Sequence, residues 1–181
     1  MPLRRRLKSD LAPVHDRLDA LFSGFDLRDP DDLGGFLAAH RLAFAAIRPA
    51  PGGATGGALL DRMTAALDAD LAALGRAPGP ALPLLELREP LAQDYVLLGS
   101  RLGTQVLARR WAEGRDPRAR TAGRYLSLPP MAAEWRGFCE MADRLPGDDA
   151  RAAAVLAEAA ALFALFHAAG EAAGAQARRA A

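Results

Sequence analysis

Two glycines interrupt a stretch near the middle of the chain that is otherwise well suited to form a helix. Residues 95–111 read YVLLGSRLGTQVLARRW, in which Gly99 and Gly103 lie four residues apart. A glycine inside a helix costs roughly 1 kcal/mol relative to alanine, so two of them on one helical face need a reason. Small residues at this spacing often let a second helix pack closely, which requires no ligand. Taken alone, the spacing favours close packing.

The composition predicts a helical protein without an obvious polyanionic partner. Of the 181 residues, 51% are hydrophobic, and the alanine and leucine among them are strong helix formers. The 23 basic and 22 acidic residues leave a net charge of +1, which gives no reason to expect nucleic acid as a partner. The single cysteine, Cys139, excludes an internal disulfide framework. We expect one all-α domain over residues 1–181, with its core at about 3–175.

Neither end of the chain predicts a membrane segment. The N-terminal MPLRRRLKSDLAPVHD is basic but lacks the apolar centre of a signal peptide. The longest apolar run, residues 152–170, is mostly alanine and contains Glu158 and His167, which favours a buried helix over a membrane span. We therefore expect a soluble, cytoplasmic protein.

Apolar residues at helical spacing, together with cap residues, predict six or so helices and no strands. Ser9 or Asp10 is the expected cap of the first helix, which places Pro13 near its first turn. Asp29-Pro30 predicts the start of a second helix that ends near Ile47. The remaining expectations are a loop at 48–57, a helix at 57–74, a connector at 75–83, a helical region at 84–112 that Pro90 kinks or splits, a basic loop at 113–128, a helix starting near Pro129-Pro130, a helix at 148–174, and a frayed C-terminal AQARRAA.

The histidines are the first candidates for chemistry. His15 borders the apolar face of the first helix, and Asp19 lies one turn further on, where its carboxylate could fix the tautomer of a metal-bound imidazole. A boundary histidine paired locally with Asp19 is the alternative, and the spacing alone favours it. His40 and His167 have no companions at metal-ligand spacing, so a zinc site made only of protein side chains is not expected.

Two segments in order resemble a known family. Residues 7–27, LKSDLAPVHDRLDALFSGFDL, resemble the first helix of bacterial heme oxygenases, with a basic residue, a histidine seven later and an acid four beyond it. Residues 95–110, YVLLGSRLGTQVLARR, resemble the distal helix of the same family. Residues 125–145 and 159–173 look like its last two helices, so the resemblance covers roughly residues 3–175.

The resemblance implies a heme held between a proximal and a distal helix. His15 would be the axial iron ligand and Asp19 its hydrogen-bonding partner. Gly99 and Gly103, with Ser100 between them, would let the distal backbone lie close to the porphyrin and shape the catalytic side. Ser100 stands where many family members carry an aspartate. The implied propionate contacts are Lys8 and Arg136, with Tyr95, Arg4 and Arg124 as weaker candidates.

The implied activity is the oxidative cleavage of heme to biliverdin, carbon monoxide and ferrous iron. Heme is then both substrate and cofactor, O2 is consumed, and a separate reductase or ferredoxin supplies the electrons. The product could serve iron acquisition or supply the chromophore of a bilin-accepting phytochrome, and the sequence does not choose between these. Two alternatives stay open: a heme carrier or sensor of the same fold that leaves its ligand intact, and a helical interaction module without heme.

Overall fold

The computed structural model describes residues 1–52 and 57–180, and this part of the chain is mostly helical. The prediction of an all-α fold is confirmed. Seven helices and two strands of two residues each follow one another along the described chain: α1 (Leu3–Phe22), α2 (Pro30–Ala46), β1 (Ile47–Arg48), α3 (Gly57–Ala73), β2 (Leu85–Glu86), α4 (Pro90–Ala112), α5 (Pro117–Arg120), α6 (Ala132–Arg144) and α7 (Ala150–Ala180).

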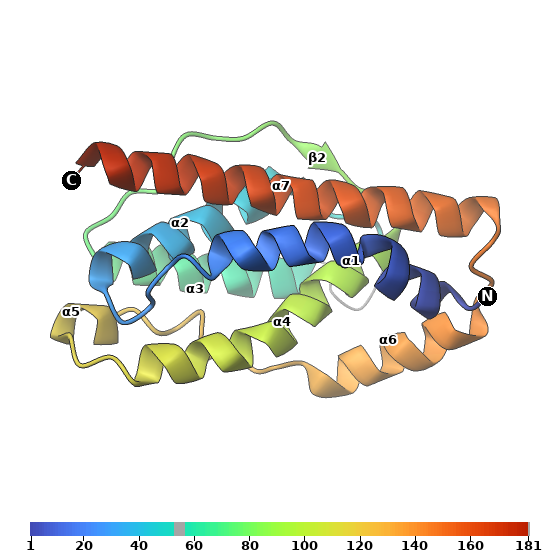
Figure 1. Cartoon of the computed structure of the whole chain (residues 1–181), viewed down its shortest axis with the longest axis horizontal. Coiled ribbons are helices and arrows are strands. Elements are labelled where there is room, and N and C mark those ends of the chain that lie inside the picture. Colours follow the sequence, from blue (N-terminus) through green and yellow to red (C-terminus); the bar gives the residue numbers. More distant parts are fainter. Residues whose placement is uncertain (53–56, 181) are drawn as a thin grey trace.

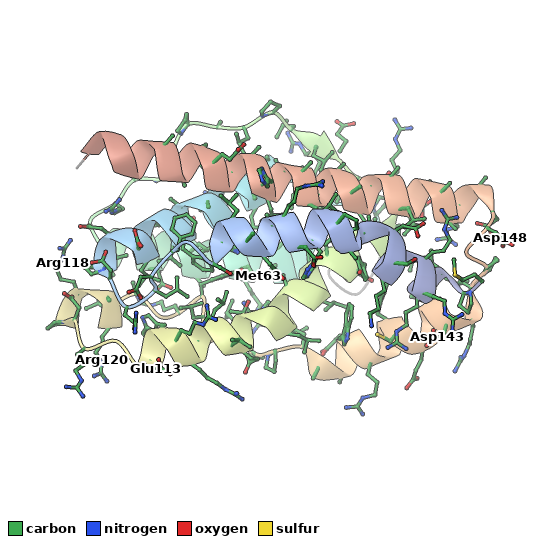
Figure 2. The ribbon with its side chains drawn as sticks, in the orientation of Figure 1. Met63, Glu113, Arg118, Arg120, Asp143 and Asp148 are labelled. Atoms are coloured by element: carbon green, nitrogen blue, oxygen red, sulfur yellow. The ribbon has the colours of Figure 1, made fainter. Side chains whose placement is uncertain are left out.

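The long helix α7 lies along one side of the molecule and packs against three other helices (Figure 1). It packs along α1, α2 and α4, while α3 packs on α2 and α6 packs on both α1 and α4. By length and composition, the segment Ala150–Ala175 could also cross a membrane, and 44% of its most apolar window is buried inside the molecule. Its buried side chains face the core, which includes Met63 in α3 (Figure 2).

Helix α1 begins earlier than the sequence predicted. The expected cap at Ser9 or Asp10 is wrong, because the helix starts at Leu3 and continues the buried stripe of Leu3, Leu7 and Leu11. Contacts with the α6–α7 junction hold this start in place: the Leu3 amide donates to the Leu145 carbonyl at 3.0 Å. Pro13 consequently lies inside the helix rather than in its first turn. Pro13 is exposed, so water can reach the carbonyl that its missing N–H leaves without a partner.

Helix α2 starts where its cap predicts. The Asp29 side chain accepts hydrogen bonds from the amides of Asp31 and Asp32, and Pro30 occupies the first helical position. The helix ends at Ala46, and the next two residues pair in parallel with β2, Ile47 opposite Leu85. The expectation of no strands is therefore wrong for two short segments. Of the loop predicted at 48–57, residues 53–56 lie outside the described residues, while the helix predicted at 57–74 is α3.

Helix α4 runs from Pro90 to Ala112, so the helical region predicted at 84–112 ends where expected but starts later than predicted. Pro90 starts the helix rather than kinking or splitting it. Proline suits the first helical position because its missing N–H would have no partner there. The chain before it is tied to α7 instead: Glu158 accepts the backbone N–H groups of Arg88 and Glu89 at 2.9–3.1 Å. A partly buried carboxylate from a distant helix thus replaces the local hydrogen bonds that a longer helix would have made.

Three further boundaries differ from prediction. The basic loop expected at 113–128 contains the short helix α5, which the side chain of Asp116 caps. The helix expected to start near Pro129-Pro130 begins at Ala132, after Met131 in a left-handed conformation with φ of 55°. Helix α7 extends to Ala180, so the expected helix end near Gly170 to Gly174 is wrong. The expectation of a frayed C-terminus is also wrong for the residues as far as Ala180. Its alanine-rich sequence tolerates two internal glycines without ending the helix.

Candidate functional site

Helices α1 and α4, which carry the predicted site residues, are held mainly by α6 and α7 rather than by each other. Both pack on α6 and α7, and α1 with α4 is not among the closely packed pairs in the described chain. In Figure 1 the first turns of α4 pass behind α1, after which α4 diverges from it. Tyr95 connects the two near this crossing, where its hydroxyl donates to the carbonyl of Leu7 at 3.4 Å.

His15 and Asp19 form the predicted pair on α1. The Nδ1 atom of His15 lies 3.1 Å from Oδ2 of Asp19, and both side chains are more than half exposed. The edge of the imidazole faces Phe163 of α7, with ring centroids 5.7 Å apart. Because Asp19 engages Nδ1, the other ring nitrogen, Nε2, is the one available to an outside ligand. This geometry fits both interpretations of the pair, a metal-bound histidine and a locally paired boundary residue.

The two glycines of α4 occupy different environments. A Cβ added at Gly99 would lie 3.5 Å from Cζ3 of Trp135, an ordinary van der Waals contact with a side chain of α6. A Cβ added at Gly103 would meet no neighbouring segment within 4 Å among the described residues. Gly103 is exposed, as is Val106 three residues later, whose exposed fraction is 54%. Close helix packing therefore does not account for Gly103.

The two hydroxyl side chains nearest the glycines, Ser100 and Thr104, are hydrogen-bonded within α4. The Ser100 hydroxyl donates to the Leu97 carbonyl at 2.8 Å, and the Thr104 hydroxyl donates to the Ser100 carbonyl at the same distance. Ser100 is partly exposed, and Leu98 beside it is fully buried. The hydroxyl of Ser100 therefore lies at the edge of the exposed face of α4, with its proton directed into the helix.

Of the predicted cations, Arg4 and Arg136 line the same cavity although they lie on different helices. Lys8 and Arg136 are exposed, the former on α1 and the latter on α6. Arg4 is paired with Asp143 at 2.8 Å, close to the N-terminus (Figure 2). Arg124 lies 3.6 Å from the buried carboxylate of Asp70 in α3, so a role for it at the α1–α4 site has no support in these contacts.

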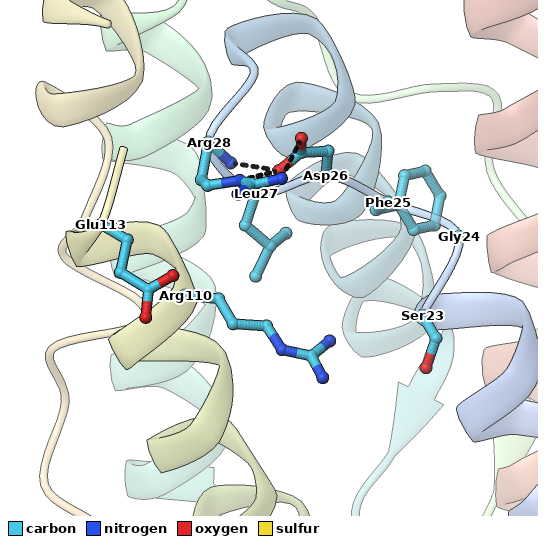
Figure 3. Close-up of a pocket in the computed structure, with 8 residues that line it drawn as sticks. All are labelled: Ser23, Gly24, Phe25, Asp26, Leu27, Arg28, Arg110 and Glu113. Atoms are coloured by element: carbon cyan, nitrogen blue, oxygen red, sulfur yellow. Dashed lines mark hydrogen bonds and ion pairs between the residues drawn. The ribbon is translucent and has the colours of Figure 1, made fainter. Parts of the chain in front are cut away.

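Two cavities occur near the ends of α1. One, of about 350 Å³, is lined by Arg136 and Trp135 together with Arg4, Ala132, Cys139, Glu140 and Asp143. The other, of about 340 Å³, lies between the α1–α2 connection and the end of α4, where Arg110 extends toward Ser23 (Figure 3). In this second cavity Arg28 holds Asp26 through two hydrogen bonds of 2.8 and 2.9 Å, which lower the pKa of Asp26 to about 2. Neither cavity is lined by His15, Gly99 or Gly103 among the described residues.

A buried polar cluster behind α4 was not predicted from the sequence. Arg101 has no exposed surface, and its guanidinium donates to the carbonyls of Leu128 at 2.7 Å and Pro129 at 3.4 Å. It also lies 5.2 Å from the ring centroid of Tyr125, a distance typical of a cation–π contact. Within the described chain the buried Tyr125 hydroxyl has no hydrogen-bond partner, and burial raises the pKa of Tyr125 to about 12. Nothing in the sequence around Arg101 indicates this burial, because arginine is seldom fully buried.

Trp135 is the other residue that the sequence did not single out for this site. Its ring covers Gly99 and stacks on Phe138 with centroids 5.5 Å apart, and Tyr95 lies 6.0 Å away. Nothing in the local sequence pattern of α6 indicates that this ring reaches α4.

Comparisons with known proteins add no relative. No protein-family model matches the chain, and no curated protein matches it either. The described residues also contain no group of three or more His, Cys, Asp or Glu side chains that could hold a metal ion. Ligation of a heme iron by one histidine needs no such group.

Proposed function

We propose that the chain is a heme oxygenase that cleaves heme to biliverdin, carbon monoxide and ferrous iron with O2 and external electrons. The observation that carries the proposal is the environment of Gly103. A glycine inside a helix costs stability, and at Gly103 no neighbouring segment among the described residues lies close enough to require it. A flat ligand that approaches the exposed backbone of α4 would supply the missing reason.

The donor chemistry of α1 fits such a ligand. His15 has Nδ1 beside Asp19, which orients the ring and leaves Nε2 for an iron. When bound, heme supplies the redox-active iron at which O2 is reduced, and the porphyrin is itself the substrate. The chain's own part is to hold the macrocycle between α1 and α4, with Lys8, Arg136 and Tyr95 as the groups near which its propionates would lie. Gly99, Ser100 and Gly103 would form the side on which O2 reacts.

A second candidate is a heme carrier or sensor of the same fold that does not degrade its ligand. The bond from the Ser100 hydroxyl to the Leu97 carbonyl favours it, because this hydroxyl has its proton committed to the helix. The buried neighbour Leu98 offers no acid in its place. Under this proposal the same residues bind heme, but proton delivery to bound oxygen is too weak for turnover.

The optical spectrum of the hemin-loaded protein separates these functions. Reductant is added in air, with catalase present to remove free peroxide, and the spectrum is followed over time. A Soret band that decays while a broad red bilin absorption grows supports a heme oxygenase, and a Soret band that persists supports the carrier or sensor. No Soret band at all would leave a helical interaction module.

A heme oxygenase needs an electron donor and a use for its products. An electron-donor protein, either a reductase or a ferredoxin, would act with it in the cytoplasm. The bilin product could pass to a phytochrome, or the reaction could serve the release of iron from heme.

A further inference from the structure

The ring of Trp135 covers one end of the helical face of α4 that is otherwise exposed. Tyr95, Gly99 and Gly103 follow one another at intervals of four residues, so they lie along the same helical face, one turn apart. The ring of Trp135 lies over Gly99, while the backbone at Gly103 has no neighbouring segment within 4 Å among the described residues. Along this face, therefore, the covered part ends and the exposed part begins within a single turn.

Two aromatic rings pack on Trp135 and hold it in this position. Its ring is stacked on Phe138 of the same helix, with the planes inclined by 20°. The ring of Tyr95 lies 6.0 Å from both Trp135 and Phe138, and its hydroxyl is bonded to the Leu7 carbonyl of α1. Three elements thus fix the indole, and a ligand could displace it only by breaking these contacts.

The other end of the exposed face lies further along α4, at Val106 and Arg110. Val106 continues it as an exposed apolar side chain, and Arg110 extends into the cavity beside the α1–α2 connection. From Gly99 to Arg110 the helix rises about 16 Å, long enough for a porphyrin to lie lengthwise. A planar ligand on this face could slide toward Arg110, but in the other direction it meets the edge of the indole.

We propose that Trp135 is the side chain against which one edge of the bound porphyrin rests, so that it fixes the position of heme in its own plane. The inference rests on the proposed function. By fixing this position, Trp135 also decides which meso carbon faces the side where oxygen reacts, and hence which biliverdin isomer forms. Arg136, the next residue and a lining residue of the adjoining cavity, then lies beside the same edge.

Fluorine NMR of the full chain labelled with fluorotryptophan tests the contact directly. The chain has two tryptophans, Trp111 and Trp135, and the variant Trp111→Phe assigns their two resonances. Trp111 is a matched reference, because at about 100° per residue it leaves α4 about 140° away from Val106 of the exposed face, and its Nε1 donates to the Ala119 carbonyl at 2.9 Å. Paramagnetic hemin should broaden the Trp135 resonance beyond detection and leave the Trp111 resonance visible. The diamagnetic zinc protoporphyrin should shift the Trp135 resonance without this broadening.

Substitution at Trp135 tests the consequence for heme placement. In Trp135→Ala, the heme-methyl proton resonances of the cyanide complex should split into two or more sets, and one dominant biliverdin isomer should become a mixture. Trp135→Phe and Trp111→Phe should both show the wild-type set of heme-methyl resonances and the wild-type biliverdin isomer. If hemin does not bind the wild-type chain, both this inference and the heme oxygenase proposal are overturned. If hemin binds but broadens both fluorine resonances equally, or if Trp135→Ala keeps a single set of heme-methyl resonances, only the role of Trp135 is overturned.

Discussion

Gly103 of α4 and Gly137 of α6 share one structural environment: each lies inside a helix, and a Cβ at either would meet no neighbouring segment within 4 Å in the described chain. Both are exposed. They differ in location, because only Gly103 lies on the helix that the resemblance assigns to the distal side of a heme. Comparing substitutions at the two positions therefore separates the effect of a glycine on helix stability from its effect on ligand binding.

We predict that Gly103→Ala and Gly137→Ala each raise the free energy of unfolding by about 0.5–1 kcal/mol in the ligand-free protein, since alanine is the better helix former. Urea denaturation measures this gain. Only Gly103→Ala should also weaken hemin binding, by tenfold or more in an optical titration, because its methyl group would lie where the porphyrin approaches. Equal hemin affinity in both variants would contradict the proposed position of the ligand.

His15 and His167 form a second matched pair. Each places Nδ1 near a carboxylate four residues later, at 3.1 Å from Asp19 and at 3.5 Å from Glu171. We predict that His15→Ala removes the histidine-ligated spectrum of the ferric heme complex and that added imidazole restores it, because the free base can occupy the same position on the iron. His167→Ala should leave the spectrum unchanged. A His15→Ala complex with the wild-type spectrum would remove His15 as the axial ligand.

The sequence predicted those elements of the fold whose signals are local. Asp29 and Pro30 mark the start of α2 correctly because a cap and its proline act within one turn. The start of α1 was missed because a distant contact decides it, the bond from the Leu3 amide to the Leu145 carbonyl. The start of α4 was missed for a similar reason, since Glu158 of α7 holds the backbone before Pro90. Such contacts between distant segments are invisible to periodicity.

The candidate site shows the same division. The spacing of His15 and Asp19 predicted their contact, because four residues make one helical turn. The sequence could not predict that Gly99 and Gly103 differ, since this depends on the ring of Trp135 arriving from α6. Nor could it place Arg101 in the interior, because arginine is seldom fully buried and the carbonyls that receive its protons lie 27 and 28 residues away.

Arg101 and Tyr125 lie in contact but should respond very differently to substitution. Arg101→Met removes the buried guanidinium that donates to the carbonyls of Leu128 and Pro129, and charge-assisted hydrogen bonds are the stronger kind, so we predict a loss of about 3 kcal/mol in the free energy of unfolding. Tyr125→Phe removes a hydroxyl that has no hydrogen-bond partner in the described chain and keeps the ring beneath the guanidinium, so stability should change by less than about 0.5 kcal/mol. Urea denaturation of both variants tests this. A large loss in Tyr125→Phe would mean that the hydroxyl is bonded in solution, for example to water.

His40 should make the protein less stable in mild acid. Part of the residue remains exposed, but its ring packs among aromatic rings that include Phe36 and Tyr125, at centroid distances of 4.2 and 5.3 Å, and its Nδ1 lies 2.9 Å from the Phe36 carbonyl. Burial, aided by the charge of Arg101, lowers the pKa of His40 from 6.5 to about 4. Between these values the unfolded chain binds a proton that the folded chain does not. Stability should therefore fall as the pH drops from 6.5 to 4, by up to about 1.4 kcal/mol per pH unit.

The buried carboxyl of Asp70 acts in the opposite direction. Burial raises its pKa above the ordinary 3.8, so between these two pKa values the folded chain binds the extra proton and gains stability as the pH falls. A variant is therefore needed to isolate His40, and His40→Phe removes the titrating group while it keeps an aromatic ring in the cluster. We predict that the difference in free energy of unfolding between the wild type and His40→Phe is constant above about pH 7 and shifts against the wild type as the pH falls toward 4. Urea denaturation at several pH values measures this difference. Parallel profiles for the two proteins would show that His40 is accessible enough to titrate normally in the folded state.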